Sequence, residues 1–453
     1  MPLLLDEDRW LRWISKKKEG TETTYTEAVT YLRSLRRYGI RPGLVRTVEL
    51  LRRLGNPHQA NVRVFHITGT NGKGSVSSMI EAALRAGGYK TGLYTSPEME
   101  MFRERIQVEG RPISEFAVAR LIERVKPAVE EMVAEGFDQP TEFEVTTVLA
   151  FLYYAEEGID ALVLEVGMGG RYDATNVVVR PLVTVVTNVS LDHMEVLGPT
   201  VGQIAWNKAG IIKSGVPCIT GASDEAQRVL RQVAQEMGAR LIDARSAALI
   251  QSASLHGQRV DLRVAGTVQV GLELSLLGRH QAQNAVMALE ALEAARQQGL
   301  PLSDAAIREG LRNVRWPGRF EVWDATAPVP VVLDCAHNEA GMAALAVALN
   351  EYFPGRKAVV VLGMLSDKET GPSIRHLLPH MRAVVVTTPR SPRALDAVSM
   401  ASMLPPTLAA VVESVPEKAL AKAYRMLQAG ELLLITGSCY VVGPLRRTLA
   451  ARS

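Results

Sequence analysis

Short apolar runs alternate with segments of helical periodicity along most of the chain. In the first two thirds, the runs with strand character are residues 62–68, 91–94, 161–166, 182–187 and 217–220. Strands that alternate with helices in this way are typical of a largely parallel sheet covered by helices on both faces. The segment before residue 62 has a helical pattern instead.

The alternation changes after residue 250. Two strand-like runs within residues 260–276 flank Ala265-Gly266 and predict a β-hairpin, and a helix is predicted from about residue 280 to 298. Pro317-Gly318 interrupts the pattern and predicts a linker at 315–318. Four further strands are predicted at 329–333, 359–362, 383–386 and 432–435. We therefore predict two α/β domains: a parallel-sheet domain at residues 1–314 and a smaller, Rossmann-like domain at residues 319–453.

Composition narrows the class of protein. Of the 453 residues, 47% are hydrophobic and 22% charged, which is too apolar for a disordered chain. The formal charge of +3 is spread along the chain, so we expect no nucleic-acid partner. The basic cluster is interpreted as a solvated helix face. It comprises Lys16, Lys17, Lys18, Arg33, Arg36, Arg37 and Arg41.

The cysteines and the amino terminus indicate a compartment. Cys218, Cys335 and Cys439 are far apart and show neither metal-site spacing nor a disulfide framework. No apolar run approaches the roughly 18 residues of a membrane span. Residues 6–9 read Asp-Glu-Asp-Arg where a signal peptide needs its apolar stretch. We expect a monomer in the cytoplasm, without a membrane partner.

A glycine-rich segment links the first predicted strand to a helix predicted at about residues 75–86. It reads Ile67-Thr68-Gly69-Thr70-Asn71-Gly72-Lys73-Gly74-Ser75. Glycines at such a turn let backbone N–H groups face phosphate oxygens, and the helix N-terminus adds partial positive charge. The Walker pattern is incomplete, because Gly74 stands where Ser or Thr should follow the lysine. The loop alone leaves a small-molecule kinase open, whereas a GTPase is disfavoured because Asn207-Lys208-Ala209-Gly210 lacks the guanine-reading aspartate.

Further short motifs occur in order across both predicted domains. Besides the loop at Gly69–Ser75, they are Leu54-Gly-Asn-Pro57, Thr95-Ser-Pro97, Glu104-Arg-Ile106, Leu164-Glu-Val-Gly-Met-Gly-Gly-Arg171, Asp173-Ala-Thr-Asn176, Leu191-Asp-His193, Lys208-Ala-Gly-Ile-Ile-Lys213, Gln281–Asn284, Pro317-Gly-Arg-Phe-Glu321, Asp334-Cys-Ala-His-Asn338, Asp367-Lys368 and Gly437-Ser438. Together they resemble the folylpolyglutamate synthase and dihydrofolate synthase branch of the Mur ligase superfamily. The resemblance implies a two-domain ligase with ATP bound by a P-loop in the cleft between the domains. A carboxylate of dihydropteroate or a reduced folate would become an acyl phosphate, which L-glutamate then attacks. We expect a bifunctional enzyme.

The resemblance also implies two magnesium sites. Ser96 and Glu144 match the first site, His193 matches the second, and Lys208 matches a lysine that is carbamylated in the family. From the residues alone, Thr141-x-x-Glu144 is also a capping box, and Lys208 could be an exposed lysine at a helix C-terminus. The residues expected to act in catalysis are Lys73, Glu144, His193 and Lys208. Glu165 is a further carboxylate near the site, with no assigned role.

Nucleotide and substrate residues follow from the same resemblance. The expected nucleotide ligands are Gly69, Thr70, Asn71, Gly72, Lys73, Gly74, Ser75, Asn284, Arg319, Asp334 and His337. Without the resemblance, Asn284 would be a polar helix residue, Asp334 a turn residue and Arg319 a pin between domains. Ser114 and Phe116 follow Glu104-Arg-Ile106, as the family's pterin-binding stretch does, although Phe116 could equally belong to the core.

The chain departs from the family pattern in places, and two rivals remain. Glu98 follows Thr-Ser-Pro where the family usually has histidine or another residue type, Cys335 replaces a glycine, and Glu369 replaces an aspartate. A cell-wall Mur ligase acting on a UDP-linked muropeptide would need an additional amino-terminal α/β domain, which the helical start does not predict. A non-catalytic nucleotide-binding regulator would not need Glu144, His193 and Lys208.

Overall fold

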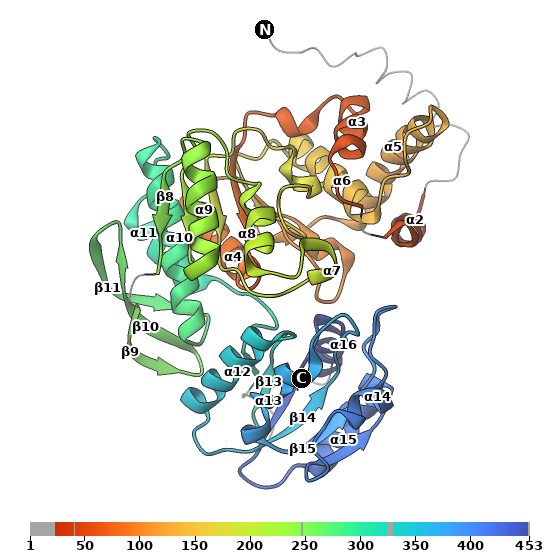
Figure 1. The fold of residues 1–453 in the computed structure, drawn as a ribbon, viewed down its shortest axis with the longest axis vertical. Coiled ribbons are helices and arrows are strands. Elements are labelled where there is room, and N and C mark those ends of the chain that lie inside the picture. The colour runs from red at the N-terminus through yellow and green to blue at the C-terminus, as the bar shows by residue number, and fades with distance from the viewer. Residues whose placement is uncertain (1–22, 40, 246–247, 324–328, 452–453) are drawn as a thin grey trace.

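The computed structural model describes residues 23–39, 41–245, 248–323 and 329–451, which form two α/β bodies (Figure 1). The predictions for Lys16, Lys17, Lys18 and residues 6–9 lie outside these ranges. The red-to-green upper body holds everything up to the last helix before the predicted linker, and the blue lower body holds the rest. The predicted fold class is confirmed.

An eight-stranded sheet forms the centre of the upper body, in the order β4-β3-β2-β5-β1-β6-β7-β8. Its strands are β1 (Arg63–Thr68), β2 (Thr91–Tyr94), β3 (Ile106–Val108), β4 (Arg111–Pro112), β5 (Ala161–Glu165), β6 (Val183–Val186), β7 (Cys218–Thr220) and β8 (Leu241–Asp243). All neighbours from β2 to β8 pair in parallel, whereas β3 and β4 form an antiparallel edge. The five predicted strands are β1, β2, β5, β6 and β7. Strands β3, β4 and β8 were not predicted. They are less completely buried than the equally short β7, whose residues are all buried.

Helices cover both faces of this sheet, as expected for buried parallel strands. One face carries α4 (Lys73–Ala86), α10 (Arg279–Gln297) and α11 (Asp304–Asn313). The other carries α2 (Tyr25–Ser34), α3 (Val45–Arg53), α5 (Glu115–Ala134) and α6 (Glu142–Glu157). Strand β5 serves both cores, because Val163 points to the first set and Leu162 and Leu164 to the second. Helices α7 (Met194–Leu197), α8 (Val201–Ala209) and α9 (Asp224–Glu236) follow β6 and β7.

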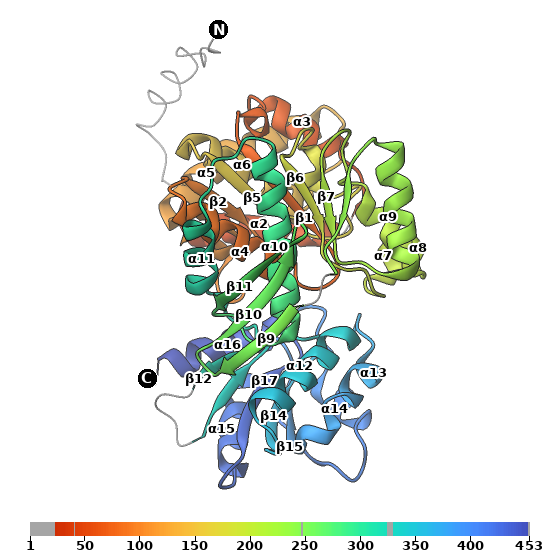
Figure 2. The same ribbon diagram turned by 90° about the vertical axis from the view of Figure 1, so that its left-hand side faces the viewer.

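A separate antiparallel sheet, β11-β10-β9, packs under α10 and reaches toward the lower body (Figure 2). The predicted hairpin is confirmed as β10 (Gly257–Val264) and β11 (Thr267–Leu274). Strand β9 (Ala248–Ser254) was not predicted. Its last three residues are exposed, so it lacks the apolar signal of a core strand, whereas Val260 and Leu262 of β10 are fully buried.

The lower body is built on a six-stranded sheet in the order β12-β13-β17-β14-β15-β16, parallel except for β12. Its strands are β12 (Glu321–Trp323), β13 (Val331–Leu333), β14 (Ala358–Leu362), β15 (Met381–Val386), β16 (Ala409–Val412) and β17 (Leu432–Thr436), and its helices are α12 (Glu339–Tyr352), α13 (Thr370–Arg375), α14 (Ala397–Ser402), α15 (Pro416–Met426) and α16 (Cys439–Ala450). Residues 315–318 lie between α11 and β12. Of the helices in the described part of the chain, none has the length and apolarity of a membrane span.

Candidate active site between the two bodies

A cavity of about 430 Å³ lies where the two bodies meet. From the upper body it is lined by the segments that follow β1, β5 and β6, which are adjacent strands, and from the lower body by those that follow β13 and β17. Ligands of parallel α/β sheets bind outside the carboxyl ends of the strands, so both sheets present their binding edge to one space. Residues 68–75 of the glycine-rich segment all line the cavity.

The loop is held by close backbone approaches that only glycine permits. Gly69 and Gly72 have positive φ angles of 148° and 82°. A Cβ atom at Gly69 would lie 1.8 Å from the Thr187 hydroxyl oxygen, and one at Gly74 would lie 2.8 Å from the Trp316 ring. The departure from the Walker pattern therefore has a steric reason. Trp316, in the predicted linker, covers the position where that pattern has Ser or Thr.

Two lysines meet at the base of the loop. Lys73 Nζ donates to the carbonyl oxygens of Gly69 and Thr70, both at 3.2 Å, and Lys208 Nζ donates to the same Gly69 oxygen at 2.8 Å. Lys208 is only 4% exposed, which contradicts the reading of an exposed helix-capping lysine. Burial, aided by the charge of Lys73, lowers the pKa of Lys208 to about 7.

Glu165 supplies the carboxylate of this region. It ends β5, the neighbour of β1, and lines the cavity with Ser96. Burial raises the pKa of Glu165 to about 7, although Lys73 and Arg319 act in the opposite direction and the Ser96 backbone N–H donates to the carboxylate. The sequence assigned Glu165 no role. Its place at the carboxyl end of a parallel strand beside the loop strand was the signal that could have identified it.

Glu144 does not reach the cavity, and its assignment to a metal site is contradicted. Its buried carboxylate accepts hydrogen bonds from Arg46 Nε at 3.0 Å and from the Thr141 N–H at 2.7 Å. Thr141 Oγ1 accepts in turn from the Glu144 N–H, which completes the capping box at the start of α6. The ion pair and the cap occupy the oxygens that a cation would need.

The two predicted substrate residues also lie away from the cavity lining. Ser114 is the N-cap of α5 and accepts from the Ala117 N–H at 3.1 Å, and Phe116 is 65% exposed. The structure therefore gives Ser114 a capping role and excludes Phe116 from the core.

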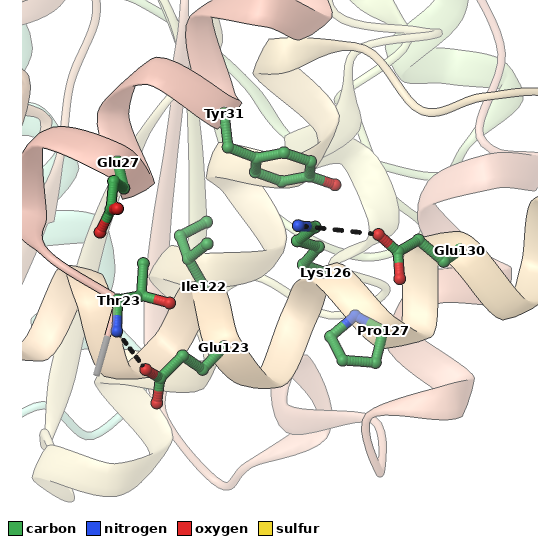
Figure 3. Close-up of a pocket in the computed structure, with 8 residues that line it drawn as sticks. All are labelled: Thr23, Glu27, Tyr31, Ile122, Glu123, Lys126, Pro127 and Glu130. Atoms are coloured by element: carbon green, nitrogen blue, oxygen red, sulfur yellow. Dashed lines mark hydrogen bonds and ion pairs between the residues drawn. The ribbon is translucent and has the colours of Figure 1, made fainter. Parts of the chain in front are cut away.

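A second hollow, of about 530 Å³, lies between α2 and α5 (Figure 3). Its carboxylates already have partners: Glu123 accepts from the Thr23 N–H at 2.7 Å, and Glu130 lies 3.9 Å from Lys126 Nζ. Glu27 belongs to the capping box of α2. None of the predicted site residues lines this hollow.

Polar pairs connect the two bodies across the main cavity. Asn71 of the loop and Asn338, the N-cap of α12, exchange two amide hydrogen bonds of 3.2 and 3.0 Å. Lys368 Nζ donates to the Asp192 carboxylate at 2.5 Å, with both side chains nearly buried. The sequence motifs contained Lys368 and Asp192 but gave no reason to pair them, because 176 residues separate them.

His193 follows Asp192 and adopts a left-handed backbone with φ of 50°. Burial, together with the charge of Lys368, lowers the pKa of His193 to about 4, so the imidazole is neutral at pH 7. A neutral imidazole is the form that binds metal ions. His193 lines the cavity together with Lys208.

The remaining predicted nucleotide residues, Asn284, Arg319, Asp334 and His337, all line the cavity. Asp334 accepts from the Phe320 and Ala336 N–H groups, both at 2.7 Å, and so holds the turn that carries its neighbours. His337 Nδ1 donates to the Cys335 carbonyl at 2.8 Å. Burial lowers the pKa of His337 to about 4, and the positive charge of Lys368 acts in the same direction.

The side chains that line the cavity suit a magnesium ion, which takes phosphate and water ligands, better than a metal ion held by protein side chains alone. Within the described residues, no three His, Cys, Asp or Glu side chains are placed to hold an ion together. Magnesium commonly uses one or two carboxylates, substrate phosphates and waters. Glu165 and the Ser96 hydroxyl lie next to the phosphate loop and match that pattern.

Comparisons with known proteins identify the family of this chain. Residues 67–292 match the model of the Mur ligase middle domain, and residues 318–439 match that of the Mur ligase glutamate ligase domain. The dihydrofolate synthase/folylpolyglutamate synthase of Bacillus subtilis is 36% identical, over 94% of this chain and 99% of its own length.

Two solved structures have the same fold over nearly the whole chain. A Mycobacterium tuberculosis folylpolyglutamate synthase complexed with ADP and AMPPCP is 33% identical, with a TM-score of 0.85, over 95% of this chain and 99% of that one. E. coli FolC in complex with DHPP and ADP is 30% identical, with a TM-score of 0.84, over 95% and 98%. The chain therefore belongs to the folylpolyglutamate synthase and dihydrofolate synthase branch of the Mur ligases and is an ATP-dependent ligase.

Proposed function

We propose that this ligase joins L-glutamate to both dihydropteroate and reduced folates. The observation that carries the proposal is the convergence of Lys73, Arg319 and Lys368 on one cavity between the two bodies. Transfer of the γ-phosphoryl group to a substrate carboxylate brings several negative charges together, and such cations stabilise them. The resulting acyl phosphate is the species that the glutamate amine attacks.

Two magnesium sites are part of this proposal. Ser96 and Glu165 would hold the first ion beside the phosphate loop, and His193 with a carbamylated Lys208 would hold the second. Bound magnesium would neutralise phosphate charge. Lys73 orients the phosphates, and the Asn71–Asn338 and Asp192–Lys368 pairs keep the two bodies together and exclude water. We further propose a cytoplasmic monomer, consistent with three free cysteines.

The substrate assignment is tested by glutamate incorporation. Purified enzyme with ATP is offered dihydropteroate, a reduced folate and a UDP-muramyl peptide in parallel, and ligation of radiolabelled glutamate is measured. We expect product with the first two acceptors and none with the third. Ligation to folates alone would remove the dihydrofolate synthase half of the proposal, and ligation to the UDP-muramyl peptide would replace it.

Glu165 and Glu144 form a matched pair of variants for the metal assignment. We expect Glu165→Gln to lower kcat by roughly 10²-fold and to raise the magnesium concentration needed for half-maximal rate, with little change in stability. We expect Glu144→Gln to break a buried ion pair and reduce the free energy of unfolding by about 3–5 kcal/mol, with kcat nearly unchanged in the folded enzyme. Magnesium titrations and urea unfolding distinguish the two. The reverse pattern would restore Glu144 as the ligand.

A further inference from the structure

Two of the three cysteines lie together in the wall of the cavity. Cys335 follows β13, and Cys439 begins α16, separated by two residues from the end of the neighbouring strand β17. The pairing of these strands continues beyond their ends, since the Asp334 N–H donates to Ile435 O at 3.0 Å and the Gly437 N–H to Ala336 O at 3.1 Å. In this register Cys335 lies opposite Gly437, two residues before Cys439, so the two cysteines stand at neighbouring positions on the same edge of the sheet.

The two thiols influence each other. Interaction with Cys335, with the guanidinium of Arg319 acting in the same direction, lowers the pKa of Cys439. The Cys335 S–H itself donates to Met99 Sδ at 3.7 Å. Cys335 is fully buried, whereas Cys439 is partly exposed and lies at a helix N-terminus, where a thiolate is stabilised. Cys439 therefore has the surroundings of a reactive thiol, and Cys335 those of its resolving partner.

The backbone of Cys335 supports two residues of the proposed nucleotide site. Its N–H donates to the carbonyl of Gly318, which precedes Arg319, at 2.9 Å. Its carbonyl accepts from His337 Nδ1 at 2.8 Å. The Cys335 sulfur also lies 3.7 Å from Met99 Sδ of the upper body. A disulfide that displaced this sulfur would therefore disturb the positions of Arg319 and His337 and the contact between the two bodies.

We propose that Cys335 and Cys439 are a peroxide-sensitive dithiol whose disulfide weakens nucleotide binding. The Cys439 thiolate attacks an oxygen of hydrogen peroxide, the O–O bond breaks, and hydroxide leaves as a sulfenic acid forms. The Cys335 sulfur then attacks Cys439 Sγ, the S–O bond breaks, and water leaves. The thiols lose two electrons and two protons, and peroxide becomes two waters. Disulfides in reducing compartments are usually transient sensors of this kind.

The test uses the full-length enzyme and measures pairing and binding separately, so it does not depend on which acceptor is ligated. Reduced protein is titrated with hydrogen peroxide, and peptides are analysed by mass spectrometry without reduction. ADP affinity is measured by calorimetry before oxidation, after it and after dithiothreitol. We expect a 335–439 cross-link and a rise in the Kd for ADP of about tenfold, both reversed by the reductant.

Three variants complete the test. Cys335→Ser and Cys439→Ser should each remove the cross-link and the change in ADP affinity on oxidation. Cys218→Ser should retain both, since Cys218 is buried in β7 of the upper body. Where a serine variant fails to fold, Cys335→Gly, with the residue that related motifs carry, takes its place. A wild-type protein without the cross-link, or with the cross-link and unchanged ADP affinity, would overturn the proposal.

Discussion

Replacing Lys73 by alanine is expected to lower kcat by about 10²–10³-fold at saturating ATP, because its ammonium acts on charge that develops in the transition state. The fold should remain intact. Within the described residues, Lys73 Nζ donates its hydrogen bonds to the carbonyls of Gly69 and Thr70, and the Gly69 oxygen keeps its hydrogen bond from Lys208. The change also removes a positive charge that acts on the buried Glu165 carboxylate, but Arg319 remains as a second cation beside it.

Single-turnover kinetics and thermal unfolding measure the two expectations for Lys73→Ala. Lys418→Ala is the matched control, since that lysine is exposed on α15 of the lower body. Its kcat and melting temperature should both stay close to those of the wild type. If Lys73→Ala kept near-normal turnover with saturating ATP, the assignment of the glycine-rich loop to phosphate binding would be wrong.

Much of the fold could be read from the sequence because buried parallel strands carry a strong signal. β1, β5 and β14 are short, nearly continuous apolar runs bounded by polar or glycine-containing turns, and each was predicted within two residues. Two strands that were not predicted, β9 and β16, bury little. β9 and β16 are largely exposed, so tertiary pairing rather than apolar pattern makes them strands.

The site was predicted less evenly, for a similar reason. Residues of the glycine-rich loop, and residues that follow a strand, such as His193, can be recognised from the sequence around them. The structure places them in the cavity. Glu144 and Glu165 show that the local sequence does not settle the role of a carboxylate. A carboxylate at the third position of a helix fits a capping box as well as a metal site, and only the fold brings Arg46 onto Glu144 and Ser96 onto Glu165. Contacts between residues that lie this far apart in the sequence leave no trace in local pattern.

The Lys208 side chain has the properties that formation of a carbamate requires. Its pKa of about 7 means that about half of the amine is neutral at pH 7, and the neutral fraction rises above that pH. Only the neutral amine attacks carbon dioxide, and it loses a proton to give an anionic carbamate. A cationic lysine repels magnesium, whereas carbamate oxygens are the hard ligands that magnesium prefers. We therefore expect activity to depend on bicarbonate and to fall as the pH drops below about 7.

Replacing Lys208 by alanine is expected to lower kcat by roughly 10²-fold, and acetate should restore part of the rate by placing a carboxylate in the vacated space. Lys73→Ala is the matched control, because acetate cannot replace a lost cation and should not rescue it. Carbon-13 NMR of the wild type in labelled bicarbonate should show a carbamate signal that Lys208→Ala lacks. Unchanged activity in Lys208→Ala, or a wild-type enzyme that works equally well without bicarbonate and shows no carbamate signal, would reduce Lys208 to a buried support for the Gly69 carbonyl.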